Sequence, residues 1–225
     1  MTKRSIFKKI TDKFSGTNGH LRVGLEIRPD GIAWAEASGT AIPEFGFEDC
    51  RPAKRAHVLQ RLVGKRGWTG AITTLVLPLD QYQVFQMDRP DGIDESELSD
   101  ALRWKLKDLL DFSPTDAVSD VFPFPEDASR GRGELVNVVA ARKSLVSELV
   151  ALVNGSGLHL ECVDIAELAL RNLVSQLDNN QRGAALVHLR ESYGQMVVCR
   201  EDTLYLSRRL DVAAGDVREA GRQEK

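Results

Sequence analysis

One stretch of this sequence decides how the rest is interpreted: Ser96-Glu97-Leu98-Ser99-Asp100-Ala101-Leu102-Arg103-Trp104-Lys105-Leu106-Lys107-Asp108-Leu109-Leu110-Asp111-Phe112-Ser113-Pro114. Its apolar residues recur three and four positions apart, the spacing of one face of an amphipathic helix. Asp94 and Glu97 have the spacing of a capping box, so we expect a helix over residues 94–110 that stops before the Phe-x-Pro turn. Trp104 falls off the apolar face, and we expect it to be half exposed or packed against a neighbouring element.

The composition is that of an ordinary globular protein. Of the 225 residues, 42% are hydrophobic and 28% are charged, as is typical of soluble domains. The 30 basic and 33 acidic residues give a net charge of −3, which offers no general attraction to nucleic acid. No apolar run approaches the roughly 18 residues that span a bilayer, and the basic N-terminus lacks the apolar core of a secretory signal. The three cysteines lack metal-site spacing, and we expect reduced, buried thiols in a cytoplasmic protein.

The first 20 residues form a basic amphipathic segment. Lysines and arginines alternate there with four apolar residues at helical spacing, Ile6, Phe7, Ile10 and Phe14. A helix of this kind can lie in a membrane interface and is attracted to anionic lipid. The alternatives are a helix packed on its own domain and a frayed basic tail.

Strands and helices are mixed along the rest of the chain. The pattern predicts a hairpin of strands 23–27 and 32–37 around Arg28-Pro29-Asp30-Gly31, because Pro-Asp-Gly favours a turn. The other expected strands are 71–77, 82–87, 118–124, 135–140, 158–163, 184–189, 195–199 and 203–210, and the other expected helices are 54–65, 144–153 and 164–178, before a polar tail over 213–225. This order indicates an α/β protein.

The usual motifs of enzymatic sites are missing from the sequence. It has no phosphate-binding P-loop, no G-x-G-x-x-G and no nucleophile elbow, and its four histidines are scattered. Asp111, Asp116 and Asp120 surround a Ser-Pro turn, where carboxylates usually serve as cap and loop residues. The basic run over residues 51–66 could contact phosphate, but a solvated helix face is the preferred interpretation. We therefore expect no catalytic residue and no metal site.

Several runs, in this order and spacing, resemble one protein family. They are Val23-Gly24-Leu25-Glu26-Ile27, Ala101-Leu102-Arg103-Trp104 through Phe112-Ser113-Pro114, Val138-Val139-Ala140-Ala141-Arg142-Lys143, Val163-Asp164-Ile165-Ala166-Glu167-Leu168, Ala185-Leu186-Val187-His188-Leu189 and Leu204-Tyr205-Leu206-Ser207-Arg208. The family is that of the type IV pilus assembly protein PilM and the MSHA pilus biogenesis protein MshI, within the actin-like ATPase superfamily.

The resemblance implies an actin-like, ribonuclease H-like first domain with an inserted β-α-β-β-α-β subdomain. Residues 21–80 and 164–180 would form the core subdomain, residues 81–163 the insertion, and residues 181–225 the start of a second actin-like domain. Three strands cannot complete that second domain, so we expect a fragment, a truncated copy or a protein completed by a partner.

Proteins of this superfamily bind phosphate with two hairpins, and in this chain the sequences of both hairpins depart from the superfamily's pattern. The hairpins need glycine, which lets backbone N–H groups approach phosphate, and an aspartate that positions the metal. In the first hairpin Glu26 stands for the aspartate and Arg28 for the glycine, before Pro29 and Gly31; in the second, His188 stands for the acid and Arg190 for the glycine. The resemblance therefore implies degenerate hairpins that bind no cofactor.

The expected function is that of a cytoplasmic scaffold in MSHA-like type IV pilus biogenesis. It would link cytoplasmic components to inner-membrane partners similar to PilN or MshJ, without hydrolysing ATP, and would touch anionic membrane through Ile6, Phe7, Ile10 and Phe14. The alternative is an actin-like ATP-binding protein related to FtsA or to PilM proper. A third hypothesis, that the chain is a nucleic-acid-binding module, is supported only by the basic runs, and the acidic net charge argues against it.

Overall fold

The computed structural model describes residues 21–38, 41–129, 131, 133–177 and 180–223. The predicted amphipathic segment over residues 1–20 lies outside this part of the chain. The chain divides into two compact units. The first unit contains residues 1–122 and 136–165, and the second unit contains residues 123–135 and 166–225.

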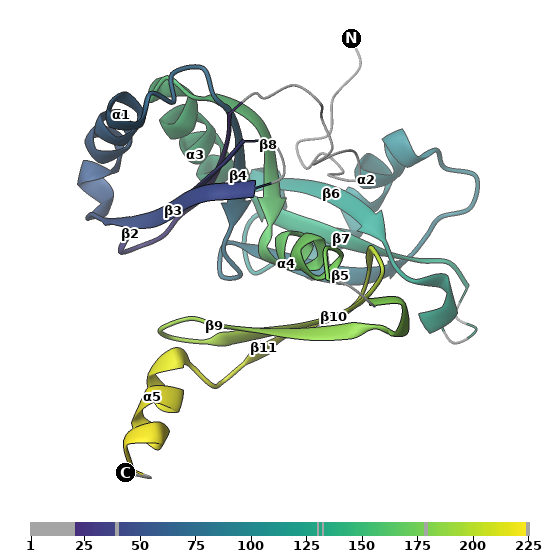
Figure 1. Cartoon of the computed structure of the whole chain (residues 1–225). Coiled ribbons are helices and arrows are strands. Elements are labelled where there is room, and N and C mark those ends of the chain that lie inside the picture. The colour runs from purple at the N-terminus through teal and green to yellow at the C-terminus, as the bar shows by residue number, and fades with distance from the viewer. Residues whose placement is uncertain (1–20, 39–40, 130, 132, 178–179, 224–225) are drawn as a thin grey trace. The chain divides into compact units, whose positions relative to one another are not determined.

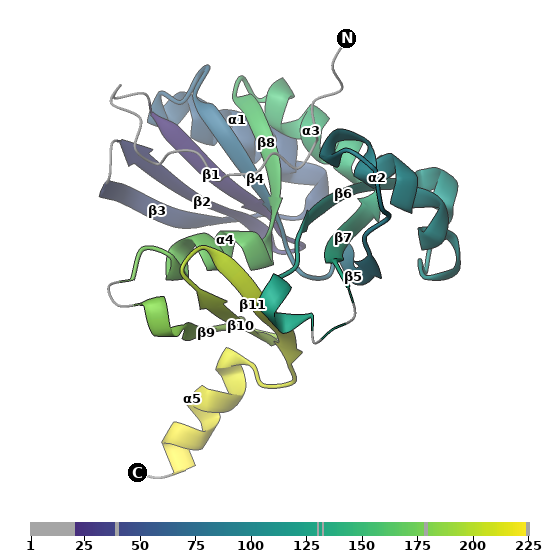
Figure 2. The ribbon, with the colours of Figure 1, turned by 90° about the vertical axis from the view of Figure 1, so that its right-hand side faces the viewer.

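The first unit is built on a five-stranded sheet of mixed direction. Its order is β3 (Ala41–Asp49), β2 (Gly31–Ser38), β1 (Arg22–Ile27), β4 (Ile72–Leu77) and β8 (His159–Ile165), and Figure 2 shows the strands side by side. The first three strands are antiparallel, whereas β1, β4 and β8 are parallel. Val23, Leu25 and Ile27 are buried on one face, as the alternation of a strand requires.

Two helices pack beside each other on this sheet (Figure 1). They are α1 (Arg55–Arg66), which follows the short 3-10 helix η1 (Pro52–Lys54), and α3 (Lys143–Gly155). Helix α1 ends at Gly67, whose positive φ of 70° suits the left-handed cap that glycine adopts easily. Helix α3 contacts α1 and β8. The sequence had predicted that the helix over 144–153 belongs to the insertion, but its apolar face covers the large sheet instead.

Residues 96–114 belong to a second, smaller sheet of the first unit and the helices beside it. Its order is β5 (Tyr82–Asp88), β7 (Leu135–Arg142) and β6 (Ala117–Pro123). Helix α2 (Glu95–Arg103) and the 3-10 helix η2 (Trp104–Asp108) lie between β5 and β6 in sequence, and the 3-10 helix η3 (Pro114–Asp116) precedes β6. The core joins residues of α2 and η2 to the sheet: Leu98, Leu102, Leu106, Met87, Val136, Val138 and Ala140.

This part of the structure differs from the predicted β-α-β-β-α-β order in its last two elements. Strand β8 pairs with β4 in the large sheet, in register from Thr74↔Cys162 to Leu77↔Ile165, and not with the small sheet. Apolar and polar residues alternate over 158–161 before Cys162 and Val163, and such a run fits either sheet, so periodicity alone could not assign it.

The predicted helix over residues 94–110 changes character at Trp104. The α-helix ends at Arg103 and continues as the 3-10 turns of η2. A 3-10 helix has three residues per turn, so the apolar face rotates, and Leu109, predicted to be part of it, is 49% exposed. The predicted capping box is also absent, because the Asp94 side chain caps nothing and only its backbone oxygen accepts from Glu97 N–H.

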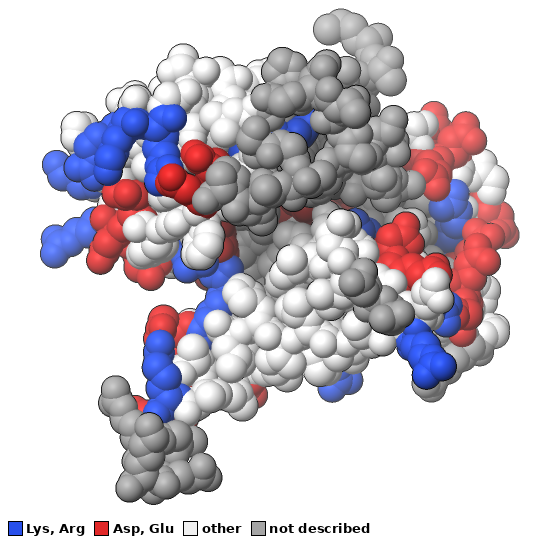
Figure 3. Space-filling view, in the orientation of Figure 1, with Lys and Arg blue, Asp and Glu red and all other residues white. Residues whose placement is uncertain are grey.

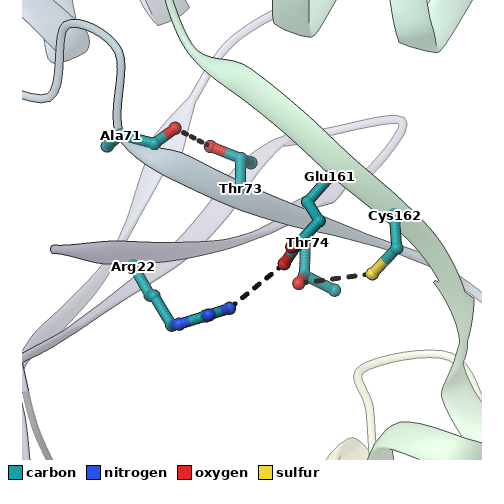
Figure 4. Close-up of polar contacts among 6 residues, drawn as sticks. All are labelled: Arg22, Ala71, Thr73, Thr74, Glu161 and Cys162. Carbon is teal, nitrogen blue, oxygen red and sulfur yellow. Dashed lines mark hydrogen bonds and ion pairs between the residues drawn. The ribbon is translucent and has the colours of Figure 1, made fainter. Parts of the chain in front are cut away.

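Polar side chains connect the parallel strands of the large sheet (Figure 4). Arg22 Nη1 donates to Glu161 Oε2 at 3.2 Å, so a residue of β1 reaches one of β8 across β4. Cys162 Sγ donates to Thr74 Oγ1 at 3.5 Å between β8 and β4. All three cysteines are buried, as predicted, and no disulfide joins them.

The second unit contains a three-stranded antiparallel sheet of order β11 (Thr203–Leu210), β10 (Gly194–Arg200) and β9 (Ala184–Leu189). Helix α4 (Ala166–Val174) contacts all three strands, and the 3-10 helix η5 (Asn180–Arg182) contacts β10. The 3-10 helix η4 (Glu126–Ala128) supplies Asp127, whose Oδ2 accepts from Arg200 at 2.6 Å and from Tyr205 at 3.0 Å. Residues 213–225 were predicted to be a polar tail, but α5 (Ala214–Gln223) forms there, and Ala213 N–H donates to Asp216 at its start.

Candidate functional site

The first predicted phosphate hairpin is the turn that joins β1 to β2. Arg28 N–H donates to Gly31 O at 2.8 Å and closes it. The Arg28 guanidinium folds back onto its own hairpin, where Nε and Nη2 donate to Glu26 Oε2 at 3.0 and 2.9 Å. The two side chains are 30% and 11% exposed. The carboxylate predicted at the metal-positioning place is therefore engaged in a local, partly buried ion pair.

Two further hydrogen bonds, both to backbone carbonyl oxygens of the turn, hold it in place. Arg55 Nη2 donates to the Arg28 carbonyl oxygen at 2.6 Å, and Cys50 N–H donates to the Asp30 carbonyl oxygen at 3.0 Å. Burial raises the pKa of the Cys50 thiol, and Arg55 partly opposes that rise. A Cβ on Gly31 would lie 2.6 Å from Phe47 Cζ and would collide with the Glu48 carbonyl oxygen. Glycine at this position is thus required for packing against β3.

The second predicted hairpin joins β9 to β10 in the second unit. Arg190 N–H donates to Tyr193 O at 2.8 Å, and His188 lies opposite Gln195 in the register of the two strands. The Tyr193 ring is buried and lies beneath the guanidinium groups of Arg209 at 4.4 Å and Arg190 at 5.7 Å, distances at which a cation is attracted to a ring face.

Residues after β11 pack against this second hairpin. Ala214 N–H donates to the Arg190 carbonyl oxygen at 2.7 Å, and Arg218 forms an ion pair with Glu191. A Cβ on Gly194 would lie 2.7 Å from the Val212 carbonyl oxygen. The start of α5 therefore contacts the base of this hairpin, while Glu191 and Ser192 at its tip stay exposed. The sequence analysis missed this contact because residues 213–225 carry few apolar side chains.

The structure brings some of the predicted residues together. Glu26, Arg28 and Gly31 share one hairpin of the first unit, whereas His188 and Arg190 share one hairpin of the second unit. Within the described ranges, no three His, Cys, Asp or Glu side chains are grouped so that they could hold a metal ion. No helix in the same ranges is long and apolar enough to cross a membrane.

An exposed aromatic surface lies where α2 passes into η2. Trp104 is 72% exposed and Leu109 is 49% exposed, and the exposed cations Arg103 and Lys107 stand beside them. These four residues are called the Trp104 surface below. Lys105 Nζ lies over the Trp104 ring at 5.9 Å, and the Arg142 guanidinium lies over the nearby Phe112 ring at 4.5 Å. Exposed tryptophan flanked by arginine is typical of residues that anchor protein partners. The sequence analysis left the position of Trp104 open between partial exposure and packing.

Solved structures, but no protein-family model and no curated protein, are similar to this chain. Among solved structures, a chain of the PilM-PilN type IV pilus biogenesis complex is similar over 93% of this chain, with a TM-score of 0.69 and 20% sequence identity. The cytoplasmic domain of EpsL, an inner-membrane component of the type II secretion system of Vibrio cholerae, is similar over 85% of this chain and 71% of its own length, with a TM-score of 0.61 and 11% identity.

A third similar solved structure is that of a protein with an actin-like ATPase fold. It is a Bacteroides thetaiotaomicron protein of unknown function with an actin-like ATPase fold, similar over 92% of this chain and 76% of its own, with a TM-score of 0.53 and 7% identity. The fold is actin-like. The predicted fold class is thereby confirmed. The chain spans 66% of the length of the matched chain in the PilM-PilN complex.

Proposed function

We propose that this chain is a scaffold of a type IV pilus assembly platform of the MSHA type, which binds an inner-membrane assembly protein similar to PilN or MshJ and does not hydrolyse ATP. The observation that carries the proposal is the similarity to a chain of the PilM-PilN complex over 93% of the sequence. The similarity to EpsL, an inner-membrane component of another assembly system, supports the same class of function.

The state of the two hairpins supports the second half of the proposal. ATP turnover in this fold requires donors and a metal directed at the transferring phosphoryl group. Glu26 is held by Arg28 instead, and in the second hairpin the Arg190 N–H donates to the Tyr193 carbonyl oxygen. An arginine can pair with a phosphate but cannot hold Mg²⁺.

A scaffold also needs a surface on which a partner is held. The Trp104 surface offers an exposed aromatic anchor with neighbouring cations, and loss of such an anchor commonly costs about 2 kcal/mol or more of binding free energy. We place the partner there. The proposed location is the cytoplasmic side of the inner membrane, with Ile6, Phe7, Ile10 and Phe14 touching anionic lipid. Liposome sedimentation with and without residues 1–18 checks that contact, and equal binding by both forms at low salt would disprove it.

The test of the function uses the purified full chain and the cytoplasmic segment of the PilN-like protein encoded in the same genome, made as a labelled peptide. We expect saturable binding in fluorescence anisotropy that Trp104→Ala weakens at least about tenfold. Leu173→Ala is the control, because Leu173 is another large exposed hydrophobic residue outside this surface. No binding by the wild-type chain would contradict the scaffold function, whereas equal binding by both variants would move the partner to another surface.

A further inference from the structure

Strand β3 forms one edge of the large sheet and has an unusual surface. It is nine residues long, and no strand in the described part of the chain pairs with its outer side. Phe45 is 80% exposed and Phe47 is 43% exposed. Edge strands are normally short, or protected by lysine, proline or bulges, because their unpaired backbone groups can accept a further strand. Pro43 and a register shift near Ser38 affect only the beginning of this strand, and the segment 44–49 contains no lysine and no proline.

The backbone of this segment is regular and faces outward at alternate residues. Cys50 N–H donates to the opposite residue, Asp30, at 3.0 Å, and the register continues without a shift from Gly31↔Asp49 to Glu36↔Glu44. Hydrogen-bonded and outward-facing residues alternate in an antiparallel pair. The backbone N–H and C=O groups of Phe45, Phe47 and Asp49 therefore face away from the sheet.

Packing of the segment against β2 requires glycine at position 46. A Cβ on Gly46 would lie 2.6 Å from Trp34 Cζ2, so only glycine lets β3 lie against that buried ring. The Trp34 ring is fixed in turn by Trp68, with ring centroids 5.3 Å apart, and by the Arg66 guanidinium at 4.1 Å. The central part of β3 thus rests on a rigid support.

Charge selects the kind of strand that can pair with this edge. Glu44 and Glu48 lie on the side of α1, where they form ion pairs with Arg66 and Arg61 and keep 54% and 32% of their side chains exposed. Asp49 is a third exposed acid. Figure 3 shows acidic side chains below the cations of α1 at this end of the sheet. Antiparallel pairing of two copies around Gly46 would place Glu44 opposite Glu48, and like charges opposite each other are unfavourable.

We propose that β3 binds, by strand addition, an extended segment of a partner protein in which apolar residues alternate with lysine or arginine. The backbone of the partner pairs with Phe45, Phe47 and Asp49. Its apolar side chains cover Phe45 and Phe47, and its cations lie beside Glu44 and Glu48. This binding site is separate from the Trp104 surface and does not depend on the proposed function.

The test uses a labelled peptide of alternating lysine and valine, equal in length to β3, and the full chain in fluorescence anisotropy. The controls are a peptide of the same composition with the lysines and valines in two blocks, and an alternating glutamate-valine peptide. Phe45→Pro removes an outward N–H group, whereas its matched control Phe45→Ala removes only the ring. We expect the alternating basic peptide alone to bind, and Phe45→Pro to weaken it about tenfold beyond Phe45→Ala. Trp104→Ala should leave this binding unchanged.

Hydrogen exchange of the wild-type chain gives a readout that does not depend on the folding of a variant. The peptide should slow exchange of the amide hydrogens of Phe45 and Phe47. Equal binding of the alternating and block peptides, or unchanged exchange at these two amides, would overturn strand addition. A concentration-dependent dimer of the free chain that Phe45→Pro abolishes would also overturn the proposal and identify a second copy as the occupant.

Discussion

Glu26 and Arg28 show how two residues change the use of a hairpin. In the sequence they stand where the superfamily has an acid and a glycine, and in the structure they bind each other at 2.9 Å. Gly31 and Gly194 are kept in the two hairpins, yet each is required by a neighbouring carbonyl oxygen that a Cβ would contact. Packing therefore accounts for the two glycines, and the Glu26 carboxylate is engaged by Arg28.

The leucines of the opening stretch give the first prediction at the scale of residues. Leu102 is fully buried among Leu98, Leu106 and Val138. Leu102→Ala should lower the free energy of unfolding by about 2–5 kcal/mol, because it removes buried methyl groups and leaves a cavity. Leu109→Ala is the matched control, since Leu109 is half exposed, and should change that energy by less than about 0.5 kcal/mol. Urea denaturation measures both, and similar losses in the two variants would contradict the assignment of the core.

At the scale of elements, Asp116 connects the small sheet to α3. Its Oδ1 accepts from Ser144 N–H at 2.9 Å and its Oδ2 from Ser144 Oγ at 2.8 Å. The N-cap residue of α3, Arg142, makes no side-chain cap bond, so the cap comes from outside the helix. The hydrogen bonds from the Ser144 side chain and backbone hold the pKa of Asp116 below its usual value. The expected role of Asp116 as a cap residue is thus confirmed.

This cap predicts a pH dependence of stability. A carboxyl whose pKa is lower in the folded state stabilises the fold above its unfolded pKa of about 3.9, and that stabilisation is lost as pH falls through the folded pKa. Asp116→Asn should therefore be less stable than the wild type at neutral pH, and the difference should disappear under strongly acidic conditions. Thermal unfolding across this range measures it, with exposed Asp111→Asn as control. A difference that stays constant with pH would show that the charge of Asp116 does not contribute.

The elements also show what sequence patterns can and cannot predict. The β1–β2 hairpin, α1, β4 and the strands of the second unit follow from turn residues and periodicity, because those signals are local. The sheet to which β8 belongs, and the sheet that α3 covers, depend on contacts between distant residues and were assigned differently. The end of α2 at Arg103 was missed because a change from α to 3-10 turns leaves almost no trace in the spacing of leucines. Helix α5 was missed because polar contacts, such as Arg218 with Glu191, hold it in place.

At the scale of the whole molecule, fold and chemistry separate. The resemblance found in short runs of sequence predicted the actin-like fold, which the solved structures confirm. The same runs identified Glu26, Arg28, His188 and Arg190 as departures, but they could not show the ion pair at the first hairpin or the contact of α5 with the second. Two exposed surfaces, around Trp104 and along β3, leave the first unit with places for partners. We propose that this actin-like fold binds proteins instead of nucleotide.

Titration of Mg-ATP into the purified full chain by isothermal calorimetry tests that account most directly. Tight binding would require a free carboxylate near the metal and backbone N–H groups open to the phosphates. Since Glu26 is paired with Arg28 and the Arg190 N–H donates to the Tyr193 carbonyl oxygen, we predict no heat of tight binding for the wild type or for Glu26→Ala. A dissociation constant in the low micromolar range that Glu26→Ala abolishes would contradict the account and make this chain a nucleotide-binding member of the actin-like proteins.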